Sequence, residues 1–150
     1  MKRPITAVLA VAIAVILFSD TLEGTAAARA GFSTASMKGS YAGIFSGQAN
    51  TGESLISLLG TGIFIADGKG NLTGHETYTF GTTPCQAAIL GTYQVDADGS
   101  GTDSVTFTTS SPGCVSGAYT QSLAIADKGD LVLLSNTNGD QINEEWHRQK

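Results

Sequence analysis

Beyond residue 31, apolar and polar residues alternate with a period of two, the pattern of a strand with one buried face. The runs are separated by short segments rich in Gly, Asn, Asp, Ser or Pro, which favour turns. This region shows no helical spacing of apolar residues. The pattern predicts eight strands, at Tyr41–Gly47, Leu55–Ala66, Asn71–Phe80, Ala88–Val95, Asp103–Thr109, Gly117–Ala126, Asp130–Ser135 and Gln141–His147.

A near-repeat at a spacing of about thirty residues marks three of the predicted turns. Its apolar runs end at Asp67-Gly68, Asp98-Gly99 and Asp127-Lys128-Gly129. Asp and Gly tolerate the positive φ angles of tight hairpins, so the repeat predicts an antiparallel up-and-down meander. An all-β, eight-stranded closed barrel is the expected fold because closure removes exposed edges, and an open sandwich is the alternative. Glycines within strands indicate bulges or bends, at Gly60, Gly62, Gly74 and Gly91.

The first thirty residues predict a cleaved signal peptide. Lys2 and Arg3 precede an apolar run at 5–18, and Ala28-Arg29-Ala30 gives a small-x-small cleavage pattern. The apolar run is shorter than the roughly twenty residues of a membrane span, although an uncleaved anchor is the alternative. We therefore expect a signal peptide at 1–30, a flexible lead-in at 31–40 and a barrel domain at 41–148, in a secreted or periplasmic protein.

Charge and cysteine content narrow the class of protein. After residue 30, five basic and eleven acidic residues remain, a net charge of about −6. This acidic balance argues against nucleic acid and anionic membranes as partners. In an exported chain, Cys85 and Cys114 are expected to form a disulfide, worth about 3–4 kcal/mol. A reactive or metal-binding thiol pair is the alternative, but neither Cys has a His near it in sequence.

Three polar residues share the apolar face of their strands: Glu76, Gln121 and Glu144. A buried carboxylate must be hydrogen-bonded, paired or protonated, and an apolar lumen with a few polar groups is typical of a small-molecule pocket. Alternatively, these residues lie at a barrel rim, or a bulge turns them to solvent. The candidate ligand-binding residues are Glu76, Tyr78, Phe80, Tyr119, Gln121, Glu144 and Trp146.

The segment 96–103 places oxygen-bearing side chains at alternate positions, as calcium loops do. Its candidate calcium ligands are Asp96, Asp98 and Asp103. Phe107 stands where an EF-hand has its bidentate Glu, so a solvated hairpin turn is the alternative. The two histidines are far apart in sequence, and no nucleotide-binding or nucleophile motif is present. We expect no cofactor, no other metal and no catalytic residue defined by a motif.

Three segments carry a family resemblance: GSYAG at 39–43, FIADGKGNLTG at 64–74 and GTYQVDADGSGT at 91–102. They resemble small exported bacterial β-barrel proteins, similar to calycin or allene-oxide-cyclase-like barrels. The resemblance implies a barrel that binds or acts on hydrophobic small molecules. No catalytic motif of that group matches this chain residue by residue, so the resemblance implies no catalytic role.

Together these features predict a non-enzymatic binding protein whose lumen accepts a small, mostly hydrophobic ligand. The first alternative is a cyclase or isomerase that uses Glu76 or Glu144 as acid and base. The second is a structural or adhesion module acting through its threonine-rich outer face. The expected partner is a small hydrophobic molecule, without nucleic acid or a stable membrane anchor, and the oligomeric state is open.

Overall fold

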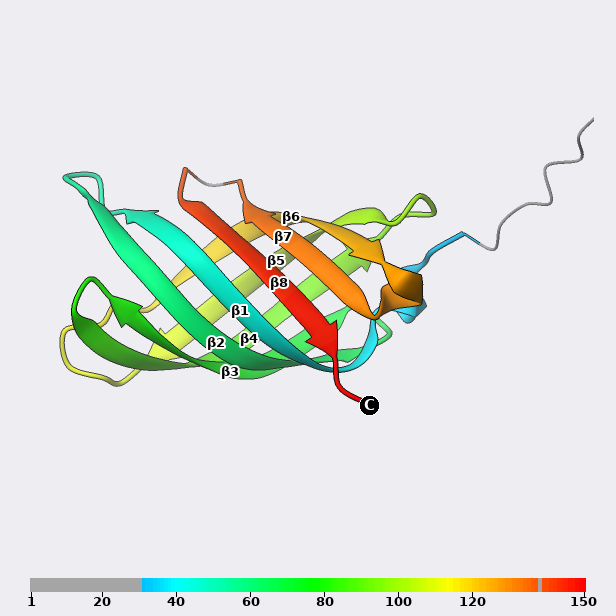
Figure 1. Ribbon diagram of the computed structural model, residues 1–150, viewed down its shortest axis with the longest axis horizontal. Helices are drawn as coiled ribbons and strands as arrows, with labels where there is room; N and C mark the ends of the chain where they lie inside the picture. The colour runs from blue at the N-terminus through cyan, green and yellow to red at the C-terminus, as the bar shows by residue number, and fades with distance from the viewer. Residues whose placement is uncertain (1–30, 138) are drawn as a thin grey trace, which may run out of the picture.

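The computed structural model describes residues 31–137 and 139–150, and the predicted signal peptide lies outside this range. Eight antiparallel strands follow one another around a closed up-and-down barrel, as the alternation predicts (Figure 1). The strands are β1 (Lys38–Asn50), β2 (Leu55–Asp67), β3 (Asn71–Phe80), β4 (Thr83–Val95), β5 (Ser100–Thr109), β6 (Gly117–Ala126), β7 (Leu131–Asn136) and β8 (Gln141–Arg148). Two short 3₁₀ helices accompany them, η1 (Thr34–Ser36) and η2 (Asp127–Gly129).

Pairing between the first and last strands closes the barrel. β1 and β8 are in register from Tyr41 opposite Arg148 to Gln48 opposite Gln141. All eight strands are thereby paired on both sides, so the barrel has no free sheet edge. The open sandwich is therefore wrong, and the closed barrel is confirmed.

β4 begins at Thr83, five residues before the predicted start at Ala88. Its first residues pair with β3 alone, since β5 has ended at that level. The backbone N–H of Gln86 donates to the Ser111 hydroxyl, 3.3 Å away in the β5–β6 loop. The backbone nitrogen of Pro84, two residues earlier, points to the same side as that of Gln86, where no strand is paired with β4 at this level. The N–H that proline lacks would therefore not have bonded to a neighbouring strand. The other seven strands begin and end within three residues of the prediction.

The three Asp-Gly turns all lie at one end of the barrel, because a thirty-residue spacing covers two strands and two turns. In the first turn, an Asp67 carboxylate oxygen accepts hydrogen bonds from the backbone N–H groups of Lys69 (2.7 Å) and Asn71 (3.0 Å). The Asn71 side chain and these N–H groups lower the pKa of Asp67 to about 2. Gly68, at φ 78°, takes the left-handed conformation that the turn needs.

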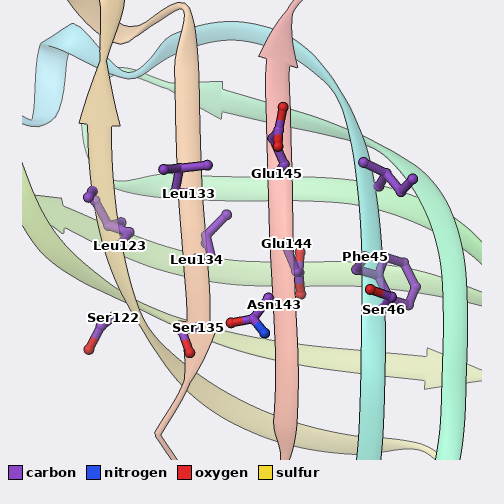
Figure 2. A pocket seen from close by; sticks show the side chains of 12 residues that line it. Phe45, Ser46, Ser122, Leu123, Leu133, Leu134, Ser135, Asn143, Glu144 and Glu145 are labelled. Carbon is purple, nitrogen blue, oxygen red and sulfur yellow. The ribbon is translucent and has the colours of Figure 1, made fainter.

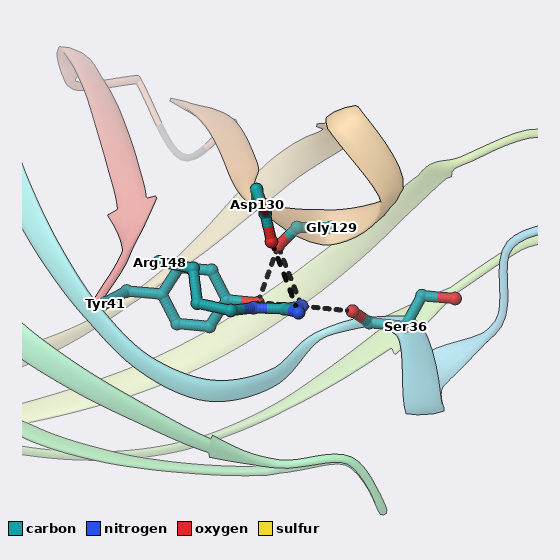
Figure 3. A network of polar contacts seen from close by, with 5 residues as sticks. All are labelled: Ser36, Tyr41, Gly129, Asp130 and Arg148. Carbon is teal, nitrogen blue, oxygen red and sulfur yellow. Dashed lines mark hydrogen bonds and ion pairs between the residues drawn. The ribbon is translucent and has the colours of Figure 1, made fainter. Parts of the chain in front are cut away.

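The lead-in at 31–40, expected to be flexible, instead covers this end of the barrel. Met37 is fully buried, and its carbonyl accepts a hydrogen bond of 2.7 Å from the Tyr93 hydroxyl. Arg148 donates to the carbonyls of Ser36 (2.7 Å) and Gly129 (2.9 Å), and so joins β8 to η1 and η2 (Figure 3). Because the lead-in, η1 and η2 cover this end of the barrel, we call it the closed end.

The closed half of the barrel is filled by a large apolar core, in which Phe64 stacks on Trp146 with ring centroids 4.2 Å apart. The strand glycines, predicted to mark bulges, lie in uninterrupted ladders. Two of them make room for side chains instead. A Cβ at Gly60 would lie 2.6 Å from the Cβ of Tyr78, and one at Gly62 would lie 2.8 Å from the Phe64 ring.

The opposite end is open, and the disulfide lies there. Cys85, at the start of β4, is bonded to Cys114 in the β5–β6 loop, with their Cα atoms 6.0 Å apart. The bond confirms the predicted pairing and joins the first residues of β4 to the β5–β6 loop at the open end. It belongs to a second, smaller core formed by Phe45, Tyr78, Cys85, Ala87 and Ile142.

Candidate functional site

A cavity of about 80 Å³ lies inside the barrel at its open end. Its walls are mostly apolar, and every strand except β4 contributes to them, together with the β5–β6 and β7–β8 loops. Polar groups enter it from four strands: Glu76 and Tyr78 from β3, Tyr119 from β6, Asn136 from β7 and Glu144 from β8. Asp140 adds a carboxyl from the β7–β8 loop, and the remaining lining residues are Phe45, Ala49, Leu58, Phe80, Phe107, Val115 and Ile142.

Among the carboxyl groups that line this cavity, that of Glu76 lacks a hydrogen-bond partner. The residue is only 8 % exposed, and no hydrogen bond or ion pair to its carboxyl is formed among the described residues. Burial, followed by the nearby charge of Glu144, raises its pKa from 4.5 to about 8. Glu76 is therefore mainly protonated at neutral pH, and as a neutral acid it can donate one hydrogen bond and accept others.

Glu144, by contrast, is held by hydrogen bonds from two sides. One carboxyl oxygen accepts a bond of 2.8 Å from the Gln121 amide, and the other accepts one of 2.9 Å from the Trp146 indole N–H. Gln121 also donates to the side-chain oxygen of Asn136, at 2.7 Å. Burial raises the pKa of Glu144, and the two hydrogen bonds partly oppose that rise. This chain of contacts fixes one wall of the cavity.

A third carboxyl, Asp103, lies inside the barrel on β5, opposite Gln121 on β6. It is 1 % exposed, and both of its oxygens, like the Gln121 Oε1, lack hydrogen-bond partners. Burial and the charge of Glu144 raise its pKa to about 7. The backbone N–H of Gln121 faces Asp103 and partly offsets that rise, without reaching hydrogen-bond geometry.

All seven candidate ligand-binding residues lie on the inner faces of their strands, as alternation predicts. Glu76, Gln121 and Glu144 are buried there, so the alternative that places these three at a rim or turns them to solvent is wrong. Five of the seven line the cavity: Glu76, Tyr78, Phe80, Tyr119 and Glu144. The other two lie outside the lining. Gln121 is behind Glu144, and Trp146 belongs to the core of the closed half.

The three calcium candidates do not converge. Asp103 lies inside the barrel, whereas Asp96 and Asp98 are exposed in the β4–β5 turn. Asp98 accepts hydrogen bonds from the backbone N–H (2.9 Å) and hydroxyl (2.6 Å) of Ser100, as a turn residue does. Within the described part of the chain, no three His, Cys, Asp or Glu side chains are arranged to hold a metal ion.

Asp103 was missed as a lumen residue, although the sequence carried the signal. Ser104, Thr106 and Thr108 form the polar outer face of β5, so Asp103 shares the inner face with Val105. Asp103 also belongs to the oxygen-rich segment 96–103, and the composition of this segment resembles a metal-binding loop more than a strand. The strand begins at Ser100, three residues before the predicted start, and this places Asp103 well inside the ladder.

A shallower hollow lies on the outside, across β6, β7, β8 and β1 (Figure 2). It has a volume of about 610 Å³ and is open to solvent along its length. Ile44 and Leu133, 54 % and 44 % exposed, are its exposed large apolar side chains, and they lie among Ser46, Ser122, Ser135, Asn143 and Glu145. Its outward-facing polar groups are solvated, so this groove lacks the buried, unpartnered group that distinguishes the inner cavity.

Among the described residues, no helix has the length and apolar character needed to cross a bilayer. Comparisons with protein-family models, with curated proteins and with solved structures gave no match, so function is inferred from the residues of the barrel itself.

Proposed function

We propose that this chain is an exported, non-enzymatic binding protein that holds a small, mostly apolar ligand in the open end of its barrel. The observation that carries the proposal is the inner cavity, in which apolar walls surround the unpartnered carboxyl of Glu76. Binding sites for small molecules are typically apolar hollows with a few placed polar groups. The disulfide supports export, because such bonds persist in oxidising compartments.

The size of the cavity limits the ligand. A volume of about 80 Å³ exceeds the 10–15 Å³ or so that one water needs, and suits a group of a few non-hydrogen atoms. A long acyl chain does not fit within this volume. A longer ligand would extend out through the mouth, past Leu58, Phe80 and Val115.

A bulky residue at the mouth tests this proposal. Ala49 lines the cavity from β1, whereas Ala42 is exposed on the outer face of the same strand. Ala49→Phe fills the mouth, and Ala42→Phe is the matched control. Native mass spectrometry of protein purified from its own host is expected to show an added mass on wild type and Ala42→Phe that is absent from Ala49→Phe. NMR titration with 1-butanol provides a second readout of the cavity. If wild type carries no added mass and binds 1-butanol no better than Ala49→Phe, the proposal is wrong.

One observation favours a second candidate, an enzyme of the cyclase or isomerase type. Glu76 has a pKa raised to about 8 beside a second carboxyl, Glu144, and such a group can exchange protons with a substrate near neutral pH. Once a ligand is identified, its conversion by wild type and by Glu76→Gln decides between binding and catalysis. Turnover that disappears in the variant while binding persists would favour the enzyme.

A further inference from the structure

The charges of the barrel are distributed unevenly along its axis. Every Lys and Arg after residue 30 lies at the closed end, at Lys38, Lys69, Lys128, Arg148 and Lys150. The four loops of the open end contain no Lys or Arg in sequence, but they carry two acidic residues, Glu53 and Asp140. Asp140 also lines the cavity. A mouth with one sign of charge attracts ligands of the opposite sign, so this mouth favours cations.

The interior repeats this imbalance. Its buried carboxyl residues are Glu76, Asp103 and Glu144, and none of the described Lys, Arg or His side chains is buried. Arg148, the half-buried cation, is engaged at the closed end with Tyr41, Ser36 and Gly129. The acids of the lumen therefore have no internal counter-ion. An anionic ligand would be repelled, whereas a cation would supply the charge that the lumen lacks.

The walls of the cavity suit a cation that carries an apolar body. Two pairs of aromatic rings line it: Phe45 with Tyr78, at a centroid distance of 6.2 Å, and Phe107 with Tyr119, at 5.8 Å. Ring faces attract ammonium groups as well as alkyl groups, and the attraction is greatest where water is excluded. Glu76, 8 % exposed and unpartnered, gives the cavity one acceptor for an N–H group.

We propose that the ligand of this cavity is a protonated amine on a short apolar body, with its ammonium group beside the Glu76 carboxylate. This inference rests on the proposed function, since it names the chemical class that the lumen would take. It accounts for three features together: acids without counter-ions, aromatic walls, and basic residues confined to the far end.

Binding of such a cation has a defined pH dependence. The ionisable groups that face Glu76 are Glu144 from β8, Tyr78 from its own strand and Tyr119 from β6, with Asp103 on β5 further inside. None of them is cationic. A pKa of about 8 leaves Glu76 mostly neutral at pH 6 and mostly ionised at pH 8.5. An amine that binds the carboxylate form therefore binds more tightly at the higher pH, and releases a proton when it binds at the lower pH.

Three ligands of equal chain length separate charge from shape: n-butylammonium, 1-butanol and butyrate. Each is titrated by NMR into the full chain with its disulfide intact, at pH 6.0 and pH 8.5. Glu76→Gln removes the proposed acceptor. Glu145→Gln is the matched control, because its side chain is exposed on the outer face of β8 next to the inward-facing Glu144.

At pH 8.5 we expect wild type to bind n-butylammonium at least tenfold more tightly than 1-butanol, and butyrate least. Lowering the pH to 6.0 should weaken n-butylammonium binding more than tenfold and leave 1-butanol unchanged within twofold. Glu76→Gln should reduce n-butylammonium affinity to that of 1-butanol, whereas Glu145→Gln should match wild type.

The outcomes distinguish this inference from the proposed function. If 1-butanol or butyrate binds as tightly as n-butylammonium, the inference that the ligand is a cation is wrong, while a binding site in the lumen remains. If n-butylammonium binds Glu76→Gln as tightly as wild type, the inference is likewise wrong and the lumen site likewise remains. Absence of binding by all three ligands would overturn this inference, and together with the absence of an added mass on the native protein it would overturn the proposed function as well. If Glu76→Gln does not fold, the charge series and the pH comparison on wild type still decide the inference.

Discussion

Replacing Glu76 by Gln should stabilise the barrel at pH 8 and reduce the dependence of its stability on pH. The two side chains have nearly the same shape, so the substitution mainly removes an ionisable group. Burial within the open half of the lumen raises the pKa of Glu76 from 4.5 to about 8. In the unfolded chain the same carboxyl ionises at its ordinary pKa, because it is surrounded by water.

The sign of the effect follows from proton binding. Between pH 4.5 and about 8, the folded protein keeps a proton on Glu76 that the unfolded chain has released. The unfolded state therefore binds fewer protons, and the free energy of unfolding falls as the pH rises through this window. Below pH 4.5 both states are protonated, and above pH 8 both are ionised, so Glu76 contributes no slope there.

The magnitude is large for a domain of this size. The pKa difference between 4.5 and about 8 corresponds to about 5 kcal/mol, at roughly 1.4 kcal/mol per unit. Whole domains have unfolding free energies of about 5–15 kcal/mol. Asp103, whose pKa is raised to about 7 by burial and by the charge of Glu144, acts in the same direction. Because Asp103 is still present in Glu76→Gln, the free energy of unfolding of this variant should also fall as the pH rises, but less steeply than that of wild type.

Urea denaturation at pH 5, 6, 7 and 8 measures this effect, with the fluorescence of Trp146, the single Trp of the chain, as the signal. The stability of Glu76→Gln relative to wild type should increase by at least about 2 kcal/mol between pH 5 and pH 8. Glu53→Gln, in the exposed β1–β2 loop, removes the same charge from a solvated position and should follow wild type. A wild-type stability that rises or stays level from pH 5 to 8, with Glu76→Gln parallel to it, would refute the reasoning.

Three further predictions concern stability and the shape of the cavity. Reducing the Cys85–Cys114 bond opens a loop of 29 residues and should lower the free energy of unfolding by about 3–4 kcal/mol, seen as a lower urea midpoint with dithiothreitol. Arg148→Lys should cost about 2 kcal/mol in the same assay, because one ammonium cannot reproduce the bonds of the guanidinium to β1, η1 and η2. Gly60→Ala places a methyl 2.6 Å from the Cβ of Tyr78, and should both destabilise the barrel by about 1–3 kcal/mol and weaken 1-butanol binding in an NMR titration.

The fold could be predicted from the sequence because its determinants are local. Alternation fixed the strands, and turn residues such as Asp67 and Gly68 fixed the hairpins, whose spacing implies neighbouring antiparallel strands. Residues 31–40 looked too polar to be structured. Their order depends on Tyr93 and Arg148, residues distant in sequence whose hydrogen bonds to this segment leave no local signal.

The candidate site was only partly predictable, because alternation gives the face of a strand and not the depth within a barrel. Glu76, Glu144 and Trp146 were all expected to point inward, and they do. Whether a residue lines the cavity or the closed core depends on how far neighbouring strands are staggered around the barrel. That stagger places Trp146 against Phe64 and leaves Glu76 in the cavity.

Buried polar groups are paired at the closed end of the barrel but not throughout its open half, and this contrast supports the proposed binding site. At the closed end, Arg148 and Tyr41 use their polar atoms in hydrogen bonds that stabilise the fold. In the open half and just behind it, the Glu76 carboxyl and both oxygens of Asp103 have no such bonds. Burying an unpaired acid destabilises a protein, and apolar residues of similar volume are often better for stability. Because these acids oppose folding at neutral pH, a ligand that supplies the missing partner would both occupy the cavity and stabilise the barrel.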